Sequence, residues 1–193
     1  MNTRNIFIVH GSYGNPKENW FPWLKMELEK LGHRVFVPQF PVPKVKASGG
    51  HKLDEWIQKF QEYKEYLNED TILVSHSKGC IFAYVLLEEL SIPLRAAFLV
   101  GPYITWKWYP PGSKEINTFQ KPSYDWQKIR RGAKHIEIFQ STNDITPVEE
   151  GKDLADKLHA TLHVVKNAGH FNVATDLKFK EFDLLLEHIK RVI

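Results

Sequence analysis

Six short apolar segments alternate along this chain with longer segments whose apolar residues recur at helical spacing. The short segments are predicted strands, at residues 5–9, 34–38, 71–74, 94–100, 135–139 and 162–165. The longer segments are predicted helices, at residues 20–31, 51–67, 80–90, 126–131, 148–158 and 179–193. This alternation favours an open, mostly parallel sheet with helices on both faces. Ligands of such sheets bind beyond the carboxyl ends of the strands, so residues that directly follow strands are the first functional candidates.

The size and charge of the chain bound its class. Its 193 residues suit a single domain over 1–193 with one hydrophobic core. The 26 basic and 23 acidic residues are spread along the sequence. The densest basic group, which is Lys128, Arg130, Arg131 and Lys134, is interpreted as a solvated helix end. With no basic stripe, no signal-peptide core and no apolar run near the roughly 20 residues of a membrane span, we expect a cytoplasmic protein without nucleic-acid or membrane partners.

The stretch Ser75-His76-Ser77-Lys78-Gly79 joins a predicted strand to an apolar helical segment. A strand, a sharp turn with small residues around a serine, and a helix form the setting of a nucleophile elbow. In that setting the serine hydroxyl projects from the end of the sheet. The usual pattern is G-x-S-x-G, and Ser75 stands in place of the first glycine. Because serine is also small, we expect the elbow to tolerate this departure and Ser77 to be a nucleophile.

Two later loops supply the partners that a serine nucleophile needs. A serine hydroxyl is weak until a base takes its proton, and the base needs a third group to orient it. Asp144 lies in a polar loop after the strand at 135–139, and His170 lies in the Gly169-His170-Phe171 loop after the strand at 162–165. The order serine, aspartate, histidine is the order found in α/β-hydrolases. We therefore predict a catalytic triad of Ser77, Asp144 and His170.

The same strand ends predict the rest of an active site. The backbone N–H groups of Lys78 and Ser12 are the expected oxyanion hole, because they belong to the residue after the nucleophile and to the turn after the first strand. Further residues are candidates for the pocket: His10, Gly11, His76, Tyr103 and Trp106. His10 is expected to buttress the oxyanion turn. The Lys78 side chain is expected to bring a cation next to the nucleophile.

The sequence gives little support for disulfide, metal or cofactor chemistry. Cys80 is the only cysteine, which excludes an intrachain disulfide, and its place before an apolar helix indicates a buried structural residue. His135 and His163 lie within predicted strands and are interpreted as structural. No metal-binding motif and no phosphate-binding glycine loop occurs. We therefore expect neither a metal nor an organic cofactor.

The chain resembles the small α/β-hydrolase-fold serine hydrolases of the retinoblastoma-binding protein 9 type and their bacterial relatives. The matching residues are His10-Gly11, Trp20-x-x-Trp23-Leu24, the elbow, Ser141-Thr142-Asn143-Asp144 and Gly169-His170-Phe171. The resemblance implies a single domain without a large cap, strand order 2-1-3-4-5-6, and a Ser-Asp-His triad.

We expect hydrolysis of a carboxylic ester, thioester or amide of a small molecule. Two alternatives stay open. One is a non-catalytic protein-binding module on a hydrolase scaffold, and the other is acyl transfer to an acceptor other than water.

Overall fold

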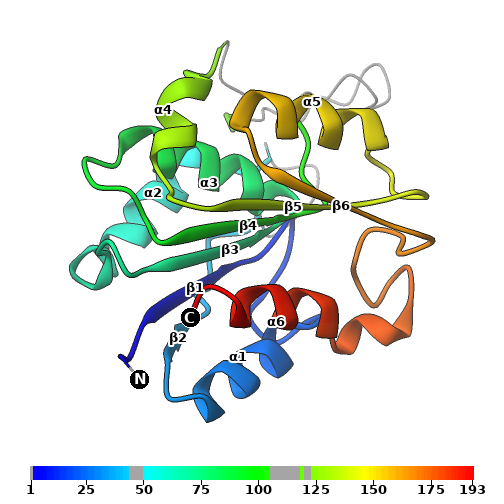
Figure 1. The fold of residues 1–193 in the computed structure, drawn as a ribbon, viewed down its shortest axis with the longest axis horizontal. Coiled ribbons are helices and arrows are strands. Elements are labelled where there is room, and N and C mark those ends of the chain that lie inside the picture. Colours follow the sequence, from blue (N-terminus) through cyan, green and yellow to red (C-terminus); the bar gives the residue numbers. More distant parts are fainter. Residues whose placement is uncertain (1, 44–49, 105–117, 120–122) are drawn as a thin grey trace.

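The computed structural model describes residues 2–43, 50–104, 118–119 and 123–193, and one parallel sheet runs through them (Figure 1). Its strands are β1 (Asn5–Val9), β2 (Arg34–Phe36), β3 (Ile72–His76), β4 (Ala96–Val100), β5 (Ile136–Ser141) and β6 (Thr161–Val165). Every pairing is parallel, and the order β2-β1-β3-β4-β5-β6 confirms the predicted sheet.

Helices cover both faces of the sheet, as predicted. They are α1 (Phe21–Lys30), α2 (Leu53–Gln61), α3 (Lys78–Glu89), α4 (Trp126–Arg131), α5 (Val148–Leu158) and α6 (Asp183–Lys190). Figure 1 shows α1 and α6 on one face and the other four on the opposite face. Alternate strand residues therefore enter two separate cores. In β1, for example, Ile8 packs in the core under α1 and α6, and Val9 packs in the core under α2 and α3.

Two predicted helices are shorter in the structure than their apolar spacing indicates. The helix predicted over 51–67 ends at Gln61, and a short 3-10 turn (Lys64–Tyr66) follows it. Tyr63 leaves the helical path to pack its ring against Phe7 and Phe36. The helix predicted over 179–193 begins at Asp183, after a separate 3-10 turn (Leu177–Lys180). In both segments, the apolar residues are buried by tertiary packing instead of by a continuous helix.

The register of the sheet places the loops that follow its strands along one edge. Val9 pairs with Ser75, and His76 pairs with Val100, so β1, β3 and β4 end together. Ser141 and Val165 likewise end β5 and β6 side by side. No helix of the described residues combines the length and the apolar character needed to cross a bilayer. Trp106 and most of the irregular stretch around it lie outside the described residues.

Candidate active site

Ser77 lies at a sharp turn between β3 and α3, where the sequence predicts a nucleophile elbow. Its backbone has φ 54° and ψ −121°, and α3 begins at the next residue. A positive φ is rare for a residue with a side chain, and such strain is typical of functional sites, at a cost of about 1–3 kcal/mol. The turn therefore holds the serine in a conformation that the surrounding packing must enforce.

Small residues on either side of Ser77 allow β3 and α3 to pack closely around this turn. A Cβ on Gly79 would lie 2.7 Å from the carbonyl oxygens of both Val9 and His10, so α3 can approach the end of β1 only with glycine there. Ser75, by contrast, has room for its side chain, and its buried hydroxyl donates to the carbonyl of Phe98 at 3.4 Å. The substitution of serine for the first glycine of the pattern is thus accommodated by the fold.

Cys80 is buried beside the elbow and is not a candidate nucleophile. Its Sγ donates to the carbonyl of Ser75 at 3.4 Å. Burial is the main cause that raises the pKa of its thiol to about 12. A thiol with so high a pKa is not ionised near neutral pH, and it is the thiolate that reacts.

Asp144 and His170 form a buried pair next to the elbow. His170 Nδ1 donates to Asp144 Oδ1 at 2.7 Å, and the Asp144 side chain is fully buried. Asp144 follows β5 and His170 follows β6, so the two loops meet at the carboxyl edge of the sheet. Gly101, at the end of β4, has φ +57°, and a Cβ there would lie 3.3 Å from both Asp144 Oδ2 and the His170 ring. Glycine at this position leaves space for the pair.

Hydrogen bonds between the two loops fix this pair in place. Ser141 Oγ accepts from the backbone N–H of Ala168 at 2.9 Å and donates to Asn143 Oδ1 at 2.8 Å. Asn143 Oδ1 also accepts from the N–H of Gly169 at 2.7 Å. In the sequence, Ser141 and Asn143 stand out only as part of the Ser141-Thr142-Asn143-Asp144 motif. Their position at the end of a strand is the signal that could have assigned them this positioning role.

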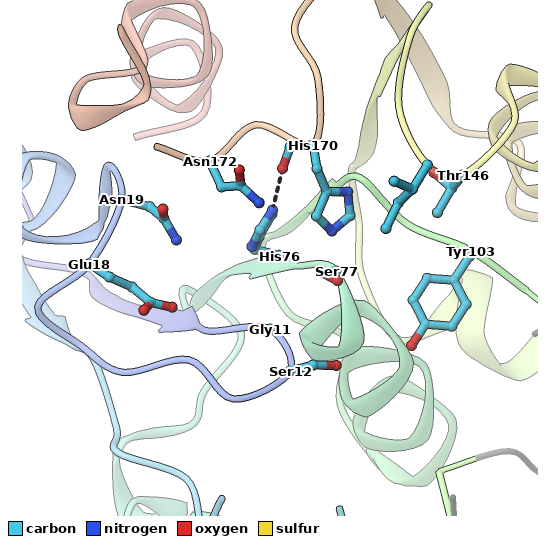
Figure 2. A pocket seen from close by; sticks show the side chains of 11 residues that line it. Gly11, Ser12, Glu18, Asn19, His76, Ser77, Tyr103, Thr146, His170 and Asn172 are labelled. Carbon is cyan, nitrogen blue, oxygen red and sulfur yellow. Dashed lines mark hydrogen bonds between the residues drawn. The ribbon is translucent and has the colours of Figure 1, made fainter. Parts of the chain in front are cut away.

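His76 also holds His170, from the opposite side. Its Nε2 donates to the carbonyl oxygen of His170 at 2.8 Å, which Figure 2 shows as a dashed line. Burial is the largest cause that lowers the pKa of His76 to about 3, and the neighbouring His170 lowers it further. His76 therefore stays neutral near pH 7 and keeps a fixed donor for this bond.

The loop after β1 passes directly over the elbow. A Cβ on Gly11 would lie 2.9 Å from the Cβ of Ser77, which places Ser12 beside Ser77 (Figure 2). His10 supports this loop. Its Nε2 accepts from the N–H of Phe40 at 3.1 Å, so its Nδ1 is the donor to the Gly11 carbonyl at 2.8 Å. Burial lowers the pKa of His10 and favours this neutral form.

A cavity of about 220 Å³ lies in front of Ser77 (Figure 2). Its lining comes from the loops that follow the strands: Gly11, Ser12, Glu18, Asn19, His76, Ser77, Tyr103, Ile145, Thr146, His170 and Asn172. The structure thus brings together most of the predicted site residues and adds five that sequence reasoning missed, namely Glu18, Asn19, Ile145, Thr146 and Asn172. These five lie in the same strand-end loops as the predicted residues, and that placement was their only signal.

The Lys78 side chain does not lie where the sequence analysis expected it. Its ammonium group lies 5.1 Å from the centre of the Phe119 ring, and the side chain is fully buried. Lys78 is absent from the described lining of the cavity. The expectation of a cation next to the nucleophile is therefore wrong for the side chain, because the first turn of α3 directs it into the core under α2 and α3.

Comparison with known proteins agrees with this geometry. The serine hydrolase family model matches residues 6–188. This chain belongs to the serine hydrolase family. It is 33% identical over 172 residues to YdeN of Bacillus subtilis (strain 168), which covers 88% of this chain and 86% of YdeN. It is 29% identical over 168 residues to the serine hydrolase RBBP9 of Rattus norvegicus, which covers 85% of each chain.

Solved structures place this serine hydrolase among α/β-hydrolase folds. The crystal structure of the ydeN gene product from B. subtilis superposes with a TM-score of 0.86 at 30% identity, covering 98% of both chains. Est1E from Butyrivibrio proteoclasticus, in a structure with bound ferulic acid, has a TM-score of 0.73 at 15% identity. That match covers 98% of this chain and 88% of Est1E, and it shows a shared fold alone.

Proposed function

We propose that this serine hydrolase cleaves a carboxylic ester of a small molecule through an acyl-enzyme formed on Ser77. The observation that carries the proposal is the positive-φ turn at Ser77, which faces the same cavity as His170 while Asp144 pairs with that histidine. Thioesters and amides react by the same chemistry. The small size of the described cavity, about 220 Å³, favours a small substrate.

The proposed reaction begins with attack of Ser77 Oγ on the substrate carbonyl carbon. His170 accepts the hydroxyl proton at Nε2 and returns it to the leaving group, which departs as the carbonyl forms again. In the described residues no hydrogen bond joins Ser77 to His170, and catalytic hydrogen bonds of this kind often tighten only when substrate binds. Water then attacks the acyl-enzyme with His170 as base, and the acid product leaves.

Two sets of groups stabilise charge in this scheme. The buried Asp144 carboxylate holds the Nδ1–H of His170 and stabilises the imidazolium that forms after proton transfer. The backbone N–H groups of Lys78 and Ser12 are proposed to bind the oxyanion. Each such donor is typically worth about 10²–10³ in rate. His10 and Gly11 position the Ser12 side of this oxyanion hole.

The test is covalent labelling with a fluorophosphonate, followed by mass spectrometry of wild type, Ser77→Ala and Ser91→Ala. Ser91 is an exposed serine on the same chain and serves as the control. We expect one adduct on Ser77 in wild type and in Ser91→Ala and none in Ser77→Ala, whose kcat for p-nitrophenyl acetate should fall by about 10⁴–10⁶. A folded wild type that takes no label, or near-normal turnover by Ser77→Ala, would contradict the proposal and favour the binding-module alternative.

A further inference from the structure

A second group of ionisable side chains lies within the sheet, away from the active site. Glu137 on β5, His163 on β6 and His188 on α6 each present a ligand atom, and these atoms all lie within 4.8 Å of one another. Glu137 lies four residues before the end of β5, so at about 3.3 Å per residue it is roughly 13 Å from the strand end that leads to Asp144. The group is separate from the proposed catalytic residues.

The fold brings these three residues together from three elements. Glu137 and Phe139 point to the same face of β5, and His163 on β6 pairs in register with Phe139. That face is covered by α6, which presents His188 on the same side as the buried Leu185 and Ile189. His163 Nε2 and His188 Nδ1 both lie 2.6 Å from Glu137 Oε2.

The contacts of this cluster are not fully explained by hydrogen bonds. His163 has hydrogen-bond geometry toward Glu137, but the buried Nδ1 of His188 makes no hydrogen bond within the described residues, although Glu137 Oε2 is 2.6 Å away. This nitrogen therefore lies close to the carboxylate without a well-directed hydrogen bond. A bound cation would give it a partner, provided that the ligand atoms move apart to the spacing of a metal site.

We propose that Glu137, His163 and His188 bind a divalent transition-metal ion of the Zn²⁺ type, which clamps α6 to β5 and β6. Two imidazoles and one carboxylate are a known ligand set for Zn²⁺, with a fourth position left to water. A tetrahedral site needs ligand atoms roughly 3.3 Å apart, given metal–ligand distances of about 2.0–2.2 Å. A small outward shift of the 2.6 Å contacts reaches that spacing.

A neighbouring residue supports the carboxylate, as metal sites require. His135 Nε2 donates to Glu137 Oε1 at 2.6 Å and leaves Oε2 to face His163 and His188. Partners of this kind orient metal ligands, and their loss typically weakens metal binding. The side chain of His163 is 21% exposed on the edge strand, which gives an ion a path into the otherwise buried site.

The clamp would act on the two strands that lead into the proposed active site. Strand β5 continues to the Asp144 loop, and β6 continues to the His170 loop. The ion binds the folded chain and not the unfolded one, so it stabilises the fold by mass action. At an ion concentration about 100-fold above Kd, the melting temperature should rise by about 5–10 °C.

The experiment titrates Zn²⁺ into metal-free wild type, His163→Gln, His188→Gln and His159→Asn, with calorimetry and melting curves as readouts. His159 is an exposed histidine outside the cluster, and asparagine suits its left-handed backbone, so this variant controls for adventitious binding. We expect one Zn²⁺ per chain in wild type and His159→Asn, and affinity at least about tenfold weaker in both cluster variants. Mg²⁺, which prefers oxygen ligands, should not stabilise the protein.

Two further readouts keep the test decisive. Far-UV circular dichroism of the metal-free variants verifies folding, and His163→Gln, at a partly exposed edge position, carries the conclusion if the buried His188→Gln does not fold. Co²⁺ in place of Zn²⁺ should give the visible spectrum of a tetrahedral site in wild type and lose it in His163→Gln. Zn²⁺ binding that is absent in wild type, or unchanged by His163→Gln, overturns the proposal.

Discussion

Strand β5 positions two buried carboxylates, one within the strand and one in the loop after it. Each carboxylate contacts at least one imidazole ring, but their surroundings differ. Asp144, in the loop after β5, lies 2.7 Å from the ring of His170, which lines the same cavity as Ser77. Glu137, inside β5, lies 2.6 Å from three rings under α6. We therefore propose that the same chemical pair serves proton transfer at the end of the strand and metal binding within it. Position relative to the end of a parallel strand decides which use is available.

The largest expected effect that separates the two carboxylates is on catalysis. Asp144→Asn should lower kcat by about 10⁴, because the amide stabilises the wrong tautomer of His170 and cannot balance the imidazolium charge. Steady-state kinetics with p-nitrophenyl acetate measures it, and Asp156→Asn, at an exposed position on α5, is the matched control. A kcat for Asp144→Asn within a few-fold of wild type would remove Asp144 from the catalytic group.

A second difference between the surroundings of Asp144 and Glu137 is their effect on how protein stability depends on pH. We expect the largest contribution from His76, which lies beside His170 in the candidate active site. The pKa of His76 is about 3 in the folded protein and 6.5 ordinarily, so between these values the unfolded chain binds a proton that the folded chain does not. Stability therefore falls as the pH drops below about 6.5, and the loss from His76 should reach about 2 kcal/mol near pH 5. Urea unfolding of wild type and His76→Gln measures this.

The comparison with His76→Gln isolates one residue, because His10 and His51 also have lowered pKa values and contribute equally to both curves. Burial is the main cause for each of them. Glutamine keeps a side-chain N–H that can reach the His170 carbonyl, so the variant should remain folded. Equal slopes of stability against pH in the two proteins would show that His76 is not buried in its neutral form.

The smallest expected effect is the change in the free energy of unfolding when Glu137 is replaced in the absence of metal. Burial by itself raises the pKa of Glu137, but hydrogen bonds from His135 and His163 outweigh it, and the pKa lies below its ordinary value. Glu137 thus contributes stability above about pH 4.5 that is lost as the pH falls through its folded pKa. With chelator present near pH 7, Glu137→Gln should lower the free energy of unfolding by about 1 kcal/mol.

Urea unfolding checks this prediction, with Glu149→Gln as the control at an exposed position on α5. The difference between Glu137→Gln and wild type should shrink in acid, where the carboxylate is protonated in both states. A difference that stays constant from neutral pH into acid would contradict the assignment of an ionised Glu137.

Local patterns in the sequence were sufficient for the sheet and for the central residues of the candidate site. The apolar segments predicted all six strands, and the four inner strands, β1, β3, β4 and β5, are buried on both faces and must therefore be apolar. The elbow around Ser77 and the polar residues after β5 and β6 could be placed together without coordinates, since the carboxyl ends of parallel strands share one edge. The roles of Ser77, Asp144 and His170 in catalysis stay predictions, as does the single-domain boundary.

Tertiary structure alone decided the features that depend on side chains meeting from distant segments. The direction of the Lys78 side chain, the early end of α2 at Gln61 and the cluster at Glu137 all result from packing between elements far apart in the chain. Periodicity reports which face of an element is buried, but it carries no information about which residues of other elements meet that face. His163 is therefore a structural residue by sequence pattern, and only the convergence of His163 and His188 on Glu137 makes the two candidate ligands.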